Sequence, residues 1–285
     1  MNDLIQPKRW FLGRKLANEN LEGQLLPKTI ALPIFSSDPL SSVAYGPQEL
    51  LMILTLGGVS FLSFAPGIAA IVVLLLSVIV LSYRKVIKAY PSGGGDYEVA
   101  TKNLGKVPAL IVASALLLDY VMTVAVSIAS GTDNVISAFP EIAPWRVEIA
   151  VGFVVLICAI NLRGIRESGV AFAIPTYLFI ASVFFMIGTG LFKLAVGETL
   201  VAPSAHYEVN VIDQLAGSTQ TAMILLLLRA FASGCSALTG IEAIANGVPA
   251  FRKPKIKNAQ TTMALMGITA ILMFVGVTAL ALISG

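Results

Sequence analysis

The chain has 285 residues, of which 56% are hydrophobic and only 12% are charged, with a net charge of +3 and a mean hydropathy of +0.85. Soluble domains carry about 25% charged residues, so this composition excludes an ordinary soluble domain. It predicts an all-α membrane protein whose helices cross the bilayer several times.

The N-terminal segment, residues 1–28, is polar and basic and has no apolar run followed by a small-residue cleavage site. We therefore do not expect a secretory signal. Basic residues mixed with Trp10, Phe11 and Leu12 favour a cytoplasmic segment at the membrane interface, although a loosely ordered tail fits the same residues. The transmembrane domain is expected to occupy residues 29–285.

The first apolar span, from about Leu26 to Leu56, is interrupted by four serines, Asp38 and Pro39. A carboxylate at the bilayer centre costs roughly 2.5–3.5 kcal/mol on insertion scales, and a proline removes a helical hydrogen bond. Irregular backbone at this depth is tolerated only against protein or a water-filled cavity. The sequence therefore predicts a helix that opens here and contributes half of a binding site.

Six further hydrophobic stretches follow, most of them near the roughly 20 residues that a helix needs to cross the hydrocarbon. Their expected limits are Phe61–Tyr83, Val107–Ala129, Val147–Leu162, Val170–Ala195, Thr219–Asn246 and Thr261–Ile283. Most of the 19 lysines and arginines lie in the N-terminal segment and in the loops at 84–106, 163–166 and 252–257. The positive-inside rule places these segments in the cytoplasm. A seventh span then ends outside, so we expect an incomplete bundle.

The third span carries a polar stripe. Asp119, Thr123 and Ser127 follow one another at helical spacing, with Tyr120 beside the first of them, so the three share one face of the helix. We expect this face to point toward the bundle interior or a water-lined path, because lipid does not tolerate a carboxylate. Interhelical hydrogen bonding explains Ser127 equally well, but it does not explain Asp119.

The sixth span has a second interruption, at 232–242, where small residues and two glycines precede a carboxylate. Thr239 and Glu242 are three residues apart, so their side chains can reach one site. Close helix packing would explain the glycines but not Glu242. Arg229, on the outer half of this span, fits either an external gate or a side chain that extends to the membrane surface.

Two broken spans, the first and the sixth, are the arrangement of an inverted five-helix repeat with a binding site near the midplane. Tyr90–Tyr97 (YPSGGGDY) resembles the cytoplasmic signature of the amino acid–polyamine–organocation (APC) superfamily. Residues 36–46, 117–133, 161–164 and 233–246 resemble the KimA-type, KUP-like potassium importers within it. This resemblance implies a LeuT-like fold with spans 1 to 7 present, and import of K⁺ coupled to H⁺ by alternating access in a bacterial plasma membrane.

The resemblance also implies the ion site and the assembly. The matching positions for ion binding are Asp38, Tyr45, Asp119, Tyr120, Thr123, Ser127 and Thr239, with K⁺ held at Asp38 and Asp119 and with Glu242 as the proton-coupling carboxylate. Family members are longer and carry a cytoplasmic domain linked to dimerisation. We therefore expect an N-terminal part with a truncated second repeat, which forms a homodimer in the full-length protein.

Two functional classes compete. Oxygen ligands suit a hard cation, whereas an amino acid permease of the same fold would hold a substrate carboxylate with backbone N–H groups of a glycine-rich break. The first break has no glycine before Gly46, Pro39 lacks an N–H, and Asp38 would repel a carboxylate. We favour the cation, and a non-transporting fragment stays open.

An enzyme is not expected, because the sequence contains no nucleophile–base or metal-ligand constellation and because 93–95 is a glycine turn in a basic loop. The expected partners are the potassium ion and the lipid bilayer, without nucleic acid. No cofactor is expected beyond K⁺ as the substrate and H⁺ as the coupling ion.

Overall fold

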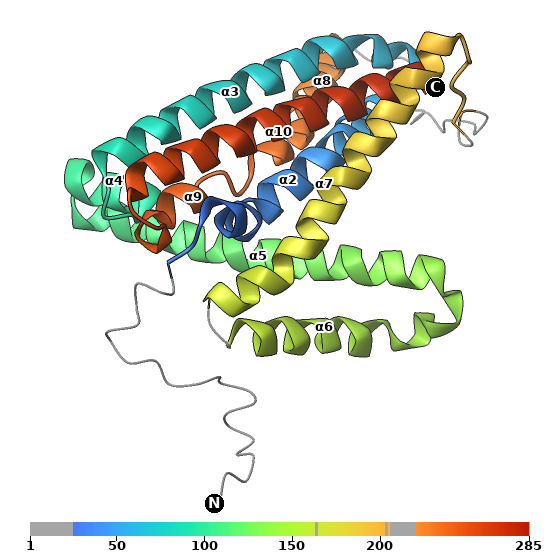
Figure 1. The fold of residues 1–285 in the computed structure, drawn as a ribbon. Helices are drawn as coiled ribbons and strands as arrows, with labels where there is room; N and C mark the ends of the chain where they lie inside the picture. The colour runs from blue at the N-terminus through green and yellow to red at the C-terminus, as the bar shows by residue number, and fades with distance from the viewer. Residues whose placement is uncertain (1–24, 163–164, 203–204, 206–219, 285) are drawn as a thin grey trace, which may run out of the picture.

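The computed structural model describes residues 25–162, 165–202, 205 and 220–284, so most of the predicted interfacial segment lies outside it. The described residues are almost entirely helical (Figure 1), and a single β-bridge joins Leu26 to Phe251. The α-helices are α2 (Lys28–Thr55), α3 (Ala65–Ala89), α4 (Gly95–Leu104), α5 (Lys106–Ala138), α6 (Arg146–Asn161), α7 (Ile165–Val196), α8 (Gln220–Gly234), α9 (Ala243–Asn246) and α10 (Lys255–Ser284). Short 3₁₀ segments are η2 (Val59–Phe64), η3 (Pro140–Trp145), η5 (Cys235–Leu238) and η6 (Val248–Ala250).

Six helical stretches of the described chain are long and apolar enough to cross a membrane. They are Val59–Ala89, Lys106–Ala138, Pro140–Asn161, Gly169–Val196, Gln220–Asn246 and Lys255–Ser284, and they correspond to the second through seventh predicted spans. The prediction of an all-helical chain with membrane-length helices is confirmed. Helix α2 has 28 residues but is not among the six, because its serines and Asp38 lower its hydropathy.

The predicted opening of the first span is wrong. Helix α2 continues without a break from Lys28 to Thr55, with Pro33, Pro39 and Pro47 inside it. Prolines are tolerated in such helices where neighbouring helices and serine hydroxyls satisfy the freed backbone groups. Here α2 packs on α7, α8, α10 and η5, and the Tyr177 hydroxyl of α7 donates at 2.8 Å to the carbonyl of Thr29, the group that Pro33 leaves without a helical donor.

Helix α2 is the centre of the buried core. It lies beside α7, α8 and α10, and α10 also packs on α3 (Figure 1). The core includes fully buried Leu40 and Val43 of α2 and Met266 and Phe274 of α10. Gly46 allows the close approach to η5, because a Cβ there would lie only 2.9 Å from the Cβ of Ala237.

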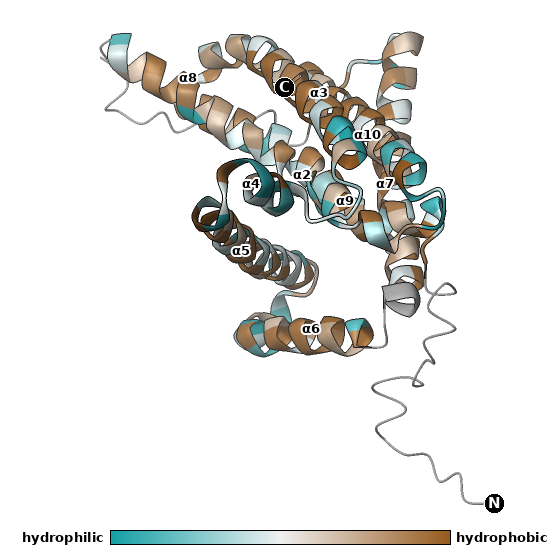
Figure 2. Cartoon of the chain, turned by 90° about the vertical axis from the view of Figure 1, so that its left-hand side faces the viewer, coloured by the Kyte–Doolittle hydropathy of each residue, from teal (hydrophilic) through white to brown (hydrophobic). Residues whose placement is uncertain are grey.

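Helices α5 and α6 lie apart from this core, and their ribbons are coloured mostly as hydrophobic (Figures 1 and 2). Leu117, Val121, Val151 and Val155 are all exposed, as suits a lipid-facing surface. The polar stripe of α5 is also largely exposed, because Asp119 and Ser127 are exposed and Thr123 is only half-buried. The stripe is therefore open rather than enclosed by the described helices, which leaves a water-lined path as the form of the prediction that stays open.

Candidate functional site

The predicted interruption of the sixth span is present. Helix α8 ends at Gly234, η5 follows, and Thr239 is extended with φ −71° and ψ 150°. Gly240 has a φ of 75°, a conformation that glycine adopts without steric penalty. Regular helix resumes only at Ala243, so a short non-helical segment lies within a membrane-length stretch.

The Asp38 carboxylate of α2 packs directly against this non-helical segment. A Cβ at Gly240 would overlap Asp38 Oδ2 and would lie 2.9 Å from Pro39 Cδ. Gly240 therefore serves two purposes, because its left-handed backbone turns the chain and its missing side chain leaves room for Asp38. The predicted pairing of the first and sixth spans is thus made by contact, although only the sixth is interrupted.

A chain of hydroxyl groups joins the same two elements. Ser42 Oγ lies 2.9 Å from both Tyr45 Oη and Thr239 Oγ1, and Thr239 donates to the carbonyl of Ser236 at 2.9 Å. Each hydroxyl has one proton to donate, so while Thr239 donates to Ser236 it can only accept from Ser42. This directed chain fixes the Thr239 hydroxyl with its proton turned away from α2.

Two hollows flank the Asp38–Gly240 contact. The first, which we call the Asp38 hollow, has a volume of about 390 Å³. Its polar lining residues are Ser37, Asp38, Ser41, Thr123, Ser127 and Thr176. Two of the three residues of the α5 stripe, Thr123 and Ser127, therefore line the same cavity as the Asp38 carboxylate.

The second, which we call the Glu242 hollow, has a volume of about 330 Å³. Its polar lining residues are Asp96, Asp119, Thr239 and Glu242, beside Gly240. Among the described residues, no lysine, arginine or histidine lines either hollow, so both favour cations electrostatically.

Glu242 is the most enclosed carboxylate of the site. Its side chain is only 9% exposed, and its Oε1 is buried without a hydrogen-bond partner among the described residues. Asp119, Asp96 and Asp38 lie close enough to repel its negative charge. A buried carboxylate with one unpartnered oxygen among like charges favours the binding of a cation.

The remaining predicted residues are less enclosed. Tyr120 is 43% exposed, and its hydroxyl accepts a hydrogen bond from Asn246 Nδ2 at 2.8 Å. Tyr45 is 42% exposed. Arg229 is exposed, and no ion pair involves it within the described part of the chain, so its role as a gate stays a prediction.

Asp38 and Asp119, the two residues predicted to hold K⁺ together, line different hollows. Within the ranges that the structure describes, no three Asp, Glu, His or Cys residues converge as they would around a tightly held metal ion. The two carboxylates therefore belong to separate hollows and do not share one cavity.

Sequence reasoning did not identify Ser42, Asn246, Tyr83 or Asp96 as part of the site. Ser42 lies three residues before Tyr45 in the motif at 36–46, which places both on one helical face and was a usable signal. The contacts of Asn246 with Tyr120 and of Tyr83 with Asp96 join separate helices. No periodicity within a single helix could have predicted them.

Comparison with known proteins gives the family. A family model described as "Amino acid permease" matches residues 34–284. The chain is 46% identical over 274 residues to the potassium transporter KimA of Bacillus subtilis, an alignment that covers 96% of this chain and 44% of that protein. It is 25% identical over 206 residues to the low-affinity putrescine importer PlaP of Escherichia coli K12, covering 70% of this chain and 42% of the importer. The chain thus spans less than half the length of these curated relatives.

Proposed function

The chain belongs to the amino acid permease family, a family of transporters and not of enzymes, and we propose that it carries the cation-binding elements of a secondary transporter that imports K⁺. The observation that carries this proposal is the contact between Asp38 and Gly240, which sets a carboxylate against non-helical backbone inside a membrane-length stretch. The 46% identity to a potassium transporter supports K⁺ as the cation.

We further propose an inverted five-helix repeat, with the N-terminus and the basic loops on the cytoplasmic side of a bacterial plasma membrane. The distribution of lysine and arginine supports this orientation. The interruption of the sixth span supports the repeat, whereas the continuous α2 does not add to that support. We propose that the complete transporter forms a homodimer, and we assign none of the residues named above to its interface.

In the proposed cycle the cation exchanges its hydration water for protein oxygens in the Asp38 hollow and then passes to the Glu242 hollow. Asp38, Thr123 and Ser127 supply oxygens in the first, and Asp119 and Thr239 supply them in the second. Because Thr239 donates its proton to Ser236, a lone pair of its oxygen is left to face a cation.

Glu242 is proposed as the coupling group. A proton on its carboxylate removes one negative charge from the hollow, so the affinity for K⁺ falls when the proton arrives and rises when it leaves. Import of K⁺ together with H⁺ requires both ions to be bound on the inward step. We therefore propose that a proton occupies Glu242 while K⁺ is held in the Asp38 hollow, and that the reduced negative charge of the Glu242 hollow then promotes release of K⁺ to the cytoplasm.

The second candidate substrate is an organic amine, because one relative is a putrescine importer and ammonium groups also bind carboxylates. An amino acid is less compatible, since its own carboxylate would meet Asp38, Asp119 and Glu242. We rank the amine below K⁺ as the substrate, because the chain is 25% identical to the putrescine importer and 46% identical to the potassium transporter.

The test is uptake of radioactive rubidium, a K⁺ substitute, by a potassium-uptake-deficient strain that expresses the complete gene. Unlabelled K⁺ should compete, whereas putrescine and amino acids should not. Asp119→Asn should abolish uptake, and the matched control Asp133→Asn should not, because Asp133 pairs with Arg146 at 2.8 Å outside both hollows. Competition by putrescine but not by K⁺ would contradict the proposal.

A further inference from the structure

Asp96 is a carboxylate of the site that neither the motifs nor the family resemblance assigned. It lies in the first turn of α4, the short helix that follows the YPSGGGDY turn. It is half-buried, and it lines the Glu242 hollow together with Asp119 and Thr239.

The carboxylate of Asp96 is held by one tyrosine. The Tyr83 hydroxyl of α3 donates to Asp96 Oδ2 at 2.8 Å and is shared with Oδ1 at 3.1 Å. No lysine or arginine pairs with Asp96 among the described residues. Tyr83 orients this carboxylate but carries no positive charge, so no described basic side chain offsets the carboxylate at the edge of the hollow.

The hollow itself shows that it is built to receive a ligand. Glu242 lines it, is 91% buried by its 9% exposure, and has a buried Oε1 without a partner in the part of the chain described. A buried oxygen of this kind needs a donor or a cation. Three carboxylates line this cavity and no described basic residue does, so its charge favours a cation over an anion.

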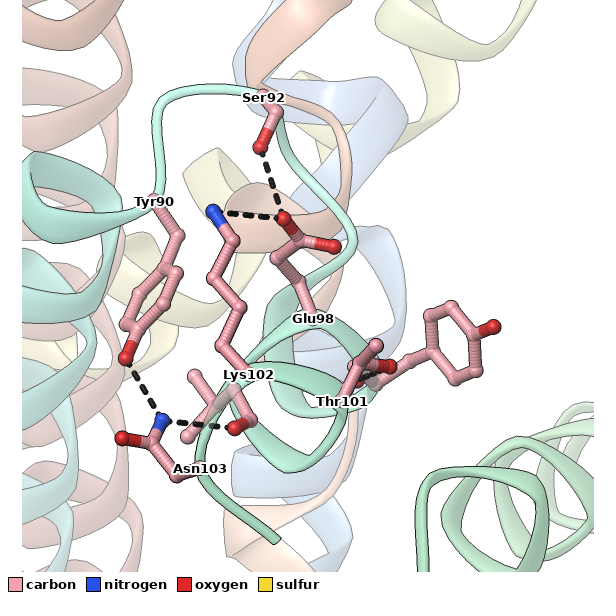
Figure 3. Close-up of polar contacts among 8 residues, drawn as sticks. Tyr90, Ser92, Glu98, Thr101, Lys102 and Asn103 are labelled. Carbon is pink, nitrogen blue, oxygen red and sulfur yellow. Dashed lines mark hydrogen bonds and ion pairs between the residues drawn. The ribbon is translucent and has the colours of Figure 1, made fainter. Parts of the chain in front are cut away.

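Glu98 provides an internal comparison, because it lies in the same first turn of α4. Its carboxylate is paired with Lys102 at 2.9 Å and accepts a bond from Ser92 (Figure 3). The hydrogen bond from Lys102 lowers the pKa of Glu98, as expected for a satisfied surface carboxylate. Glu98 therefore lies in the same helical turn as Asp96 but has a basic partner that Asp96 lacks among the described residues.

We propose that Asp96, oriented by Tyr83, is a further ion-binding residue. It binds a monovalent cation at the edge of the Glu242 hollow, at the cytoplasmic end of the path. This inference rests on the proposed transport function and extends it to a residue outside the membrane-length stretches. The step moves a bound ion between oxygen ligands, and no covalent bond changes. Asp96 acts on the ion, whereas Tyr83 is a positioning residue.

The inference is tested by measuring rubidium exchange separately from each face of the membrane. Whole cells present the outer face, and inside-out vesicles present the cytoplasmic face. Asp96→Asn should raise the half-saturating rubidium concentration at the cytoplasmic face by about tenfold or more, because one unit charge is removed near the ion. At the outer face it should stay within about twofold of the wild type.

Tyr83→Phe should move the cytoplasmic value in the same direction by a smaller factor, since the charge stays and only its orientation is lost. Glu98→Gln should leave both faces unchanged. If Asp96→Asn matches Glu98→Gln at the cytoplasmic face, or alters both faces equally, the assignment of Asp96 is overturned. Loss of flux in Asp38→Asn with normal behaviour of Asp96→Asn would refute only this inference. A wild type that carries no rubidium would refute the transport proposal as well.

Discussion

Gly240→Ala is the substitution that bears most directly on the geometry of the site. Gly240 has a φ of 75°, where an L-residue loses about 1–2 kcal/mol relative to a right-handed conformation. The new Cβ would overlap Asp38 Oδ2 and would lie 2.9 Å from Pro39 Cδ, and overpacking of this kind costs about 1–3 kcal/mol. The sum predicts a destabilisation of about 2–5 kcal/mol, together with displacement of the Asp38 carboxylate.

The matched control is Gly188→Ala in α7, where a Cβ would meet nothing within 4 Å. Alanine is a better helix former there by about 0.8–1.0 kcal/mol, so its stability should be unchanged or slightly raised. The assay combines thermal unfolding of the purified full-length protein with rubidium uptake at matched membrane levels. If Gly240→Ala keeps the stability and uptake of Gly188→Ala, the packing of Asp38 against the sixth-span interruption is not what holds the site.

The remaining predictions use the same uptake assay. Ser42→Ala removes the hydroxyl that joins Tyr45 to Thr239 and should destabilise the protein by about 1–3 kcal/mol and weaken rubidium binding. The control Ser77→Ala loses only a bond within α3, and equal effects of the two would remove Ser42 from the site. Glu242→Gln cannot exchange a proton, so its uptake should lose the pH dependence of the wild type, and a retained pH profile would assign proton coupling elsewhere.

The composition and the apolar stretches were sufficient to predict the helical membrane fold, because six of the seven predicted spans are helices both long and apolar enough to cross a membrane. The interruption at Gly240 could also be predicted from small residues and Glu242. The continuity of α2 could not, because tolerance of Pro39 depends on neighbouring helices that the local sequence does not reveal.

Some features of the site could likewise be predicted from the sequence, whereas its contacts between distant residues could not. Helical spacing placed Asp119, Thr123 and Ser127 on one face, but it could not say that this face divides between two hollows. The Ser42–Thr239 contact joins residues 197 positions apart, and its chemistry is ordinary for any two hydroxyls. Asp96 was not identified from the sequence because its place in the site depends on a hydrogen bond from Tyr83. The glycine turn at 93–95 brings the two residues together.

The central claim is that the α2 carboxylate binds the transported cation, and the most direct measurement is the initial rate of rubidium uptake by Asp38→Asn. Glu49→Gln is the matched control, because it removes a carboxylate from the same helix outside both hollows. Loss of one unit charge in contact with a partly dehydrated ion should lower uptake about a hundredfold or more at matched membrane levels. Glu49→Gln should remain near the wild-type rate, and an Asp38→Asn rate equal to that of Glu49→Gln would contradict the proposed site.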